Sequence, residues 1–242
     1  MPAPISFRTT IPGRETLPWG FSLPRHRHLE PYALVVIAGA FEQTSYAGRV
    51  NVSPGDLLVQ PTLDCHSNRL TSTSAEILRL PWTHVAGAGR MYHLRDLDGI
   101  VRAAARDVRA AIEMVRQEIA VLEPVASPRA DWPDKLALDI RQGSVSRLST
   151  WAASNGLAIE TISRGFSRLY GVVPARFRAE WRARGAWLRV VGTDESLAGI
   201  ASATGFADQA HMTRGIIALT GAAPSHWRRC HPRVMTCTPI QS

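Results

Sequence analysis

The first 97 residues alternate short apolar and polar stretches, and this pattern predicts β-strands. Residues 32–37 form a run rich in Val and Ile, and Val50 and Val52 alternate with polar residues before the turn at 54–56. Glycine and proline recur between these segments, as they do between the strands of antiparallel sheets. The pattern predicts an antiparallel sandwich or a small barrel over residues 1–97.

From residue 98 the apolar spacing becomes helical. Val101, Val108, Val115 and Leu122 recur every seven residues, with charged side chains between them, which predicts one amphipathic helix over 98–123. Its apolar stripe either packs against the β-rich region of the same chain or forms the interface of a homodimer. We favour the second interpretation, so 98–123 is predicted to be a dimerisation and coupling segment. The proline-containing stretch 124–130 is the predicted linker.

The rest of the chain contains an internal repeat. Matching positions are 49 residues apart at first and 50 apart after a one-residue insertion: Leu148 with Leu197, Ala152 with Ala201, Gly156 with Gly205, Ile162 with Met212 and Phe166 with Ile216. Each copy predicts a short helix, a glycine turn and a second helix that is apolar on one face, which is the layout of a helix-turn-helix. Residues 174–191 predict a single connecting helix that begins at Pro174.

Charge is unevenly distributed along the chain. Residues 128–242 hold 15 basic and 8 acidic residues, a net charge of +7 out of the total of +8. A basic excess confined to one region suggests a polyanionic partner, most simply nucleic acid. The sequence offers no apolar run of about 18 residues and no recognisable secretion signal, and its three cysteines are scattered. We therefore expect a cytoplasmic protein with no membrane partner.

Residues 131–229 resemble the DNA-binding domain of the AraC/XylS family of bacterial transcription regulators. The segment 200–214, IASATGFADQAHMTR, is similar to the family's signature region, and 221–228, GAAPSHWR, is similar to its usual end. The resemblance implies seven helices that form two helix-turn-helix units joined by a linking helix. The predicted DNA-binding domain therefore covers 131–230, and 231–242 is a C-terminal tail.

The resemblance also implies which side chains face DNA. They are Glu160, Thr161, Ser163, Arg164 and Arg168 in the first unit and Gln209, His211, Thr213 and Arg214 in the second, with Arg176, Arg178 and Arg182 at phosphates. Arginine can clamp guanine, and glutamine can read adenine. In the second unit Ile217 and Ala218 occupy the positions of Ser167 and Arg168. We expect this unit to make fewer phosphate contacts and to bind DNA less tightly.

The histidines of the N-terminal region resemble the two motifs of a cupin barrel, a domain that this family often carries as an effector sensor. His26 and His28 match the first motif, and His66 matches the second. Metal-binding cupins add a carboxylate shortly after the first pair, but Tyr32 stands near that position here. We therefore expect the three histidines to bind a small effector, with no metal and no cofactor. A metal site and a purely structural role stay open as alternatives.

These observations predict an α+β protein: an N-terminal cupin-like β-barrel followed by an all-α DNA-binding domain with two helix-turn-helix units. The predicted function is a ligand-responsive, sequence-specific DNA-binding transcription regulator and not an enzyme. Its expected partners are double-stranded DNA, a small-molecule effector and a second copy of the chain. One alternative is a metal-dependent cupin enzyme attached to a DNA-tethering domain. Another is a regulator that mainly binds another protein, such as RNA polymerase, through Ile217 and Ala218.

Overall fold

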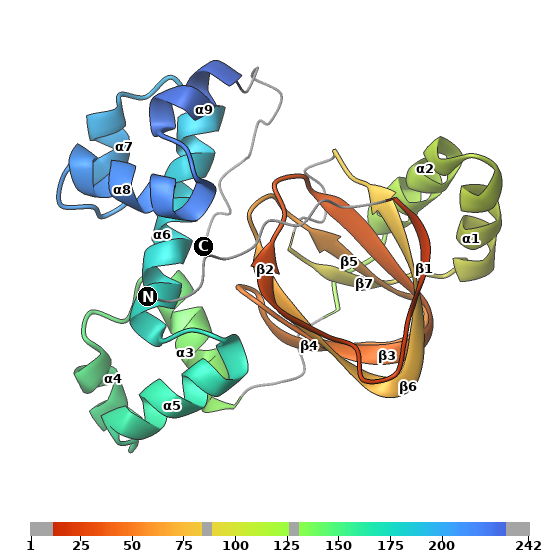
Figure 1. The fold of residues 1–242 in the computed structure, drawn as a ribbon, viewed down its shortest axis with the longest axis horizontal. Helices are drawn as coiled ribbons and strands as arrows, with labels where there is room; N and C mark the ends of the chain where they lie inside the picture. The colour runs from red at the N-terminus through yellow and green to blue at the C-terminus, as the bar shows by residue number, and fades with distance from the viewer. Residues whose placement is uncertain (1–11, 84–88, 126–130, 231–242) are drawn as a thin grey trace. The chain divides into compact units, whose positions relative to one another are not determined.

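The computed structural model describes residues 12–83, 89–125 and 131–230. The chain divides into two compact units, residues 1–171 and 172–242 (Figure 1). The boundary lies between the two helix-turn-helix copies, so the first copy shares a unit with the β-rich region. The predicted tail 231–242 and residues 126–130 of the predicted linker lie outside the described residues.

Seven strands form one sheet in the first unit, and every ladder in it is antiparallel. They are β1 (Gly13–Leu17), β2 (Ser22–Arg27), β3 (Tyr32–Ser45), β4 (Gly48–Val52), β5 (Asp56–Gln60), β6 (Cys65–Pro81) and β7 (Met91–His93). The order is β1-β6-β3-β5-β7, with β2 beside β6 and β4 beside β3. The prediction of a β-rich N-terminal region is confirmed for the part of it that the structure describes, residues 12–83 and 89–93.

The long strands β3 and β6 bend the sheet. The first half of β3 pairs with β5 and its second half with β4, while β6 pairs with β2 and then with β1. The β3–β6 register shifts on either side of Gly39, and such bulges let strands pass from one packed layer to another. At Gly39 φ is +74°, and a Cβ would collide with the Ser74 carbonyl oxygen, so glycine is required.

The predicted fold class is confirmed as an antiparallel β-rich domain followed by a helical domain, but the sheet of the cupin-like part is not closed. Among the described strands no ladder joins the β4 or β7 edge to the β1 or β2 edge. The bend at Gly39 brings apolar halves of the sheet over one another, so their inner face is buried without closure. Residues such as Leu34, Val36 and Phe41 form this inner core.

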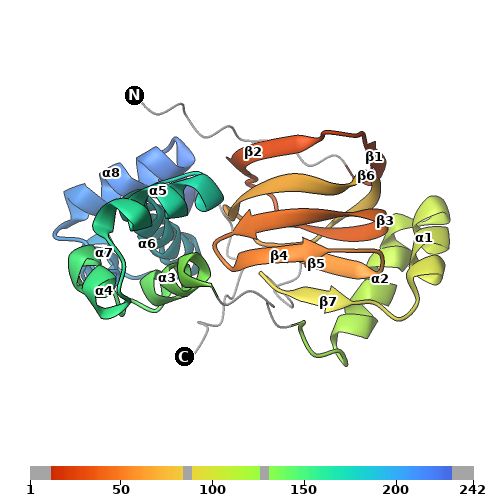
Figure 2. The same cartoon turned by 90° about the horizontal axis from the view of Figure 1, so that it is seen from below.

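Two helices cover the other face of the sheet: α1 (Leu97–Arg106) and α2 (Val108–Ile119) (Figure 2). The prediction of one helix over 98–123 is wrong. Asp107 is extended, with φ −150°, and its carboxylate accepts a hydrogen bond from the Arg109 amide, so it caps a second helix. Val115 is fully buried against the sheet, whereas Val108 is 37% exposed. The sevenfold stripe is therefore partly intramolecular core.

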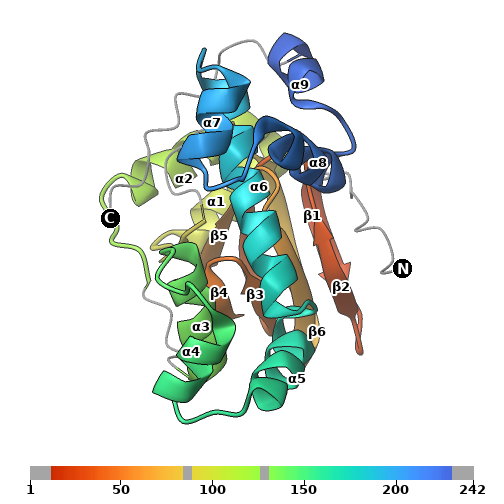
Figure 3. The same ribbon diagram turned by 90° about the vertical axis from the view of Figure 1, so that its left-hand side faces the viewer.

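Seven helices follow between residues 132 and 230, as the resemblance implied. They are α3 (Trp132–Arg141), α4 (Leu148–Ser154), α5 (Ile159–Tyr170), α6 (Pro174–Gly192), α7 (Leu197–Ala203), α8 (Gln209–Thr220) and α9 (Pro224–Cys230). In the second unit α7, α8 and α9 all contact α6 or one another around the buried Trp187 (Figure 3). No helix in the described parts of the chain is long and apolar enough to cross a membrane.

The two helix-turn-helix copies have glycines at the same positions, where a side chain would disturb the helix end or the packing. Gly171 and Gly221, 50 residues apart, end α5 and α8 in the left-handed conformation, with φ of +70° and +80°. Gly165 and Gly215 are also 50 apart, and each allows an aromatic ring to lie against its helix. A Cβ on Gly165 would be 2.7 Å from the Trp132 ring, and a Cβ on Gly215 would be 3.2 Å from the Phe206 ring.

Candidate nucleic-acid interface and ligand site

Helix α5 presents a polar outer face because its inner face is filled by core. Ile162, Phe166 and Tyr170 are buried, and the rings of the last two stack at 4.4 Å between centroids. The predicted DNA-facing side chains lie on the opposite side, where Glu160, Thr161, Arg164 and Arg168 are exposed and Ser163 is half-buried. The structure thus leaves two guanidinium groups of one helix accessible to a partner.

Helix α8 has the same division but carries less charge. Its inner side is Met212, Ile216 and Leu219. On the outer side Gln209, His211 and Arg214 are exposed, Thr213 is half-buried, Ala218 is exposed and Ile217 is 43% exposed. The Asp208 carboxylate caps the helix by accepting a hydrogen bond from the His211 amide at 2.6 Å. One arginine and an apolar pair therefore replace the two arginines of α5.

The predicted phosphate-binding arginines of α6 are half-buried. Arg176 forms an ion pair with Glu180 one turn away, at 2.8 Å. Arg182 lies over the Phe206 ring, with its guanidinium carbon 5.6 Å from the ring centroid. Burial and the neighbouring positive charge of Arg182 lower the pKa of Arg178. These side chains are more constrained than the arginines of α5.

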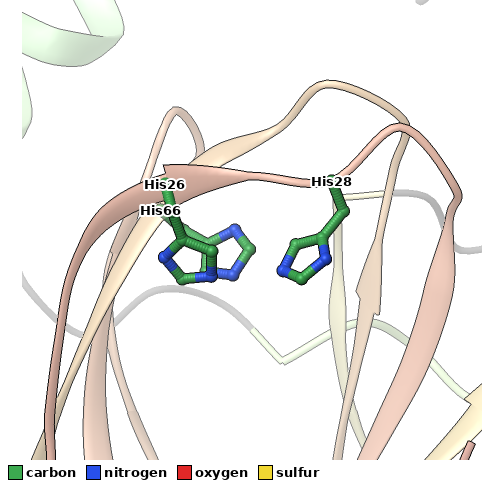
Figure 4. Close-up of side chains that lie close together, drawn as sticks. All are labelled: His26, His28 and His66. Atoms are coloured by element: carbon green, nitrogen blue, oxygen red, sulfur yellow. The ribbon is translucent and has the colours of Figure 1, made fainter. Parts of the chain in front are cut away.

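The three predicted effector-binding histidines lie together, as the strand register requires. His26 on β2 is paired directly with His66 on β6, and His28 is two residues beyond His26, so all three side chains point to the same face. Figure 4 shows the rings converging. Ring centroids are 4.4 Å apart for His26–His66, 5.0 Å for His26–His28 and 5.5 Å for His28–His66. All three residues are buried.

Hydrogen bonds and burial define the protonation of this cluster. His26 Nδ1 lies 2.9 Å from the Pro24 carbonyl oxygen, which can only accept, so Nδ1 carries the proton. The Tyr32 hydroxyl lies 3.2 Å from His66 Nε2. Burial lowers the pKa of His66 well below its ordinary value, and the charges of His26 and His28 lower it further. Burial, with the nearby Asp64 carboxylate, raises the pKa of Tyr32.

A cavity of about 330 Å³ opens from this cluster into the inner side of the bent sheet. His26, His28, Tyr32 and Asn68 provide polar groups, the ion-paired Arg14, Glu15 and Arg79 also line the cavity, and apolar residues such as Leu34, Phe41 and Ile77 form much of the rest. A concave site that combines apolar walls with a few convergent polar groups is the usual form of a small-molecule site.

A buried ion pair that no local sequence pattern indicates joins strand β4 to α3 and, through Asp134, to the end of α5. The Arg49 guanidinium donates to Asp134 on α3 at 2.8–3.2 Å and to Asp131 at 2.5 Å. The Tyr170 hydroxyl at the end of α5 donates to Asp134 Oδ1 at 2.5 Å. Although burial alone would lower the pKa of Arg49, its bonds to Asp134 and Asp131 raise it. Near it, Arg141 donates to the Tyr46 carbonyl oxygen at 3.1 Å.

Comparison with known proteins identifies the family to which the C-terminal helical region is similar. A family model described as a helix-turn-helix domain matches residues 151–230, which include α5 to α9. These residues form a domain of the AraC type, the DNA-binding domain of a family of transcription regulators. The predicted resemblance is confirmed. Among curated proteins, no sequence matches the chain.

Solved structures of such regulators are similar to parts of the chain. The C-terminal domain of AraT, a response regulator from Geobacillus stearothermophilus, is 17% identical over 48% of this chain and 97% of its own, with a TM-score of 0.41. ToxT from Vibrio cholerae, bound to an unsaturated fatty acid, is 9% identical over 90% and 94%, with a TM-score of 0.40. The DNA-binding domain of AdpA in complex with a target DNA is 20% identical over 41% and 92%, with a TM-score of 0.38.

Proposed function

We propose that this protein is a ligand-responsive, sequence-specific DNA-binding transcription regulator. The observation that supports it best is the duplicated helix-turn-helix within an AraC-type domain, whose second helices α5 and α8 bury one face and expose a polar one. The second helix of such a motif enters the major groove of DNA. The location that suits this function is the cytoplasm.

The exposed side chains divide into base-reading and phosphate-binding groups. We infer that Arg164 and Arg214 contact guanine and that Gln209 contacts adenine, because all three side chains are exposed on the second helices. Glu160, Thr161, Ser163, His211 and Thr213 complete the proposed reading surface. Arg168, one turn after Arg164, binds phosphate and so supplies affinity without sequence information.

The ligand response begins in the cavity beside His26, His28 and His66. An effector that binds there shifts the population of conformations of the β-rich region. The Arg49 ion pair offers a direct route onward, because it joins β4 to Asp134 of α3 and, through Asp134, to Tyr170 of α5. Helices α1 and α2, the predicted coupling segment, pack on the other face of the sheet.

We further propose a homodimer formed by the exposed part of α2 and the turn that follows it. Val108 and Val121, 37% and 69% exposed, are apolar side chains available to a second copy, whereas Val115 belongs to the core. Sedimentation of Val108→Glu should show a folded monomer, and Val115→Glu should unfold the sheet region. A Val108→Glu protein that remains dimeric places the interface elsewhere.

The test of the proposed function starts with selection of a binding sequence from random duplex DNA by the full-length protein. Gel-shift titration on the selected sequence then compares wild type with a protein in which Thr161→Ala and Arg164→Ala are combined. Their loss should weaken binding to the selected sequence more than binding to random duplex, while circular dichroism shows the helices intact. If selection enriches no sequence, the proposal of a sequence-specific regulator is wrong.

The histidine cluster also supports a second candidate, a metal-dependent enzyme attached to a DNA-tethering domain. Three buried histidines at the end of a cavity are compatible with such chemistry. The two candidates differ in what the cluster controls. In a regulator, His28→Gln changes how DNA affinity responds to small molecules. In an enzyme, it abolishes turnover and leaves DNA affinity unaltered.

A further inference from the structure

We propose that His26, His28 and His66 hold one divalent transition-metal ion at the end of the cavity, and that this ion binds an anionic small molecule. The inference rests on the proposed function, because it specifies the chemistry of the same effector site. It differs from the expectation in the sequence analysis that the histidines bind an effector without a metal. Four observations carry it: convergence, tautomer, composition and the open cavity.

Convergence is the first. One nitrogen from each of the three rings can be chosen so that all three lie within 4.8 Å of one another. Three imidazole nitrogens on one tetrahedral ion, each about 2.0–2.1 Å from it, are about 3.3 Å apart. The widest pair must therefore close by at most about 1.5 Å for all three nitrogens to bind one ion. The backbone register of β2 and β6 already places the three side chains on one face.

The tautomer is the second observation. His26 Nδ1 donates its proton to the Pro24 carbonyl oxygen, which leaves the Nε2 lone pair directed away from the backbone. A backbone carbonyl that accepts from one ring nitrogen is the usual partner that fixes the other nitrogen as a metal ligand.

Composition of the donor set defines the metal and its further ligand. Among the described residues the cluster contains no carboxylate and no thiolate, and Cys65 is paired with Arg27, one residue out of register with the histidines and so on the other face of the ladder. Imidazole ligands select zinc, copper, iron or nickel over magnesium or calcium. Three neutral ligands leave the charge of a divalent ion uncompensated, so the next ligand should be an anion.

Tyr32 and the cavity define where that anion binds. Tyr32 stands where a carboxylate would neutralise the metal, and its hydroxyl instead lies 3.2 Å from His66 Nε2. Once the metal takes that nitrogen, the phenol can donate a hydrogen bond to an anion in the cavity. The cavity of about 330 Å³ is lined by His26, His28 and Tyr32, so a small organic anion fits beside the ion. A carboxylate-bearing effector with an apolar body matches these walls.

The test is titration of the full-length protein, first stripped by a chelator, with Co²⁺ followed by visible absorption, and then competition with Zn²⁺. We expect one equivalent to bind, with bands typical of nitrogen ligation and without the charge-transfer band of a thiolate. His28→Gln should weaken binding by at least about 100-fold, since loss of an outer partner alone commonly costs 10–100-fold. His226→Gln is the matched control, because this exposed histidine of α9 lies outside the cluster.

Wild-type affinity in His28→Gln, or loss of binding in His226→Gln, would overturn the proposal. Should His28→Gln fail to fold, pulsed electron paramagnetic resonance of the Cu²⁺-loaded wild type counts the coordinated imidazoles. Three are expected, and fewer than three contradicts the site. Azide should shift the bands of the Co²⁺ protein, and an unchanged spectrum would overturn the anionic ligand.

The same preparations separate this inference from the proposed function. If Zn²⁺ binds through the cluster but leaves affinity for the selected DNA unchanged with and without azide, the metal site stands and the regulatory role of the cavity falls. If no metal binds, yet His28→Gln changes the response of DNA affinity to small molecules, the metal site falls and the regulator stands.

Discussion

The two helix-turn-helix copies share their inner side and differ on their outer side. In both, three apolar residues of the second helix are buried, a glycine admits an aromatic ring and a left-handed glycine ends the helix. On the outside, Arg168 of α5 corresponds to Ala218 of α8, and Ser167 corresponds to Ile217. The comparison indicates that packing fixes the repeat, while the exposed positions are free to adapt each copy to a different surface.

The ends of α5 and α8 show a second difference. Tyr170 closes α5 by donating to the buried Asp134, which also binds Arg49 of the sheet. Its equivalent on α8, Thr220, instead accepts a hydrogen bond from the Trp227 indole at 2.7 Å, within the helical unit. The first copy is therefore tied to the β-rich region by charge, and the second is closed by its own neighbours.

The largest expected effect comes from breaking that tie. Asp134→Ala leaves the buried Arg49 guanidinium without its main counter-charge, and breaking a buried pair in this way costs about 3–5 kcal/mol. Asp131, whose side chain is 54% exposed, is the matched control. Asp131→Ala should cost about 1 kcal/mol or less, because an exposed partner is well solvated. Urea unfolding of the full chain measures both.

A comparably small loss in the two variants would show that Arg49 is solvated once Asp134 is removed. In that case the contact between β4 and α3 is too weak to transmit an effector signal. Thr220→Ala provides the counterpart in the second copy. The Thr220 hydroxyl accepts from the Trp227 indole and the Ala222 amide and donates to the Ile216 carbonyl, so its loss should cost about 1–3 kcal/mol, less than the loss of Asp134 because no charge is left unpaired.

The glycine inside each second helix gives the next effect. In a helix, alanine is favoured over glycine by about 1 kcal/mol, but a new Cβ at 165 would press on the Trp132 ring at 2.7 Å. We expect Gly165→Ala to destabilise the protein by about 1–3 kcal/mol, the usual cost of overpacking. Gly215→Ala has 3.2 Å to the Phe206 ring and should change stability by less than about 1 kcal/mol. Thermal unfolding of the two variants measures both changes in stability. Equal changes would contradict the difference in packing between the two glycines.

The sequence predicts the repeat well because both its periodicity and its glycines are local. Pro174 to Val191 is predicted as one helix, and the structure has α6 from Pro174 to Gly192. The single helix over 98–123 is an avoidable error, since an aspartate before a helical stretch is a capping signal and Asp107 is such a cap. The local sequence pattern does not predict that the sheet stays open, because closure depends on which strand edges meet after the sheet bends.

The candidate ligand site was found in sequence, but its tie to the helices was not. His26 and His28 are two residues apart and so share a face in any strand, and the resemblance to the second cupin motif indicates His66. Arg49, by contrast, alternates with Asn51 on β4 and would be taken for an exposed charge. Its partners lie 82 and 85 residues further along the chain. The residues around Arg49 in the sequence do not indicate that it pairs with a buried carboxylate 85 residues further along the chain.

DNA affinity offers a comparison of equivalent arginines. Arg164 and Arg214 occupy matching, exposed positions on α5 and α8. Each alanine substitution should weaken binding to the selected sequence by about 1–3 kcal/mol, the range for one good base contact. Gel-shift titration should also show discrimination lost at one base position for each variant, and at a different position for the two. Unchanged affinity in a folded variant removes that arginine from base recognition.

The smallest effect concerns phosphate contacts and tests whether the outer faces differ as their charges suggest. Each neutralised phosphate contributes about 0.9 to the slope of log affinity against log salt concentration. Arg168→Ala should therefore flatten the slope by about one unit. Ala218→Arg should steepen it by a similar amount and tighten binding to most sequences alike, because phosphate contacts carry no base information. Binding across a salt series for wild type and both variants gives the slopes.

A steeper slope in Ala218→Arg means that α8 faces the DNA phosphates as α5 does and only lacks the positive charge. An unchanged slope means that position 218 does not face phosphate. The exposed Ile217 and Ala218 would then be better explained as an apolar contact for another protein, such as RNA polymerase, and the two copies would differ in partner rather than in affinity.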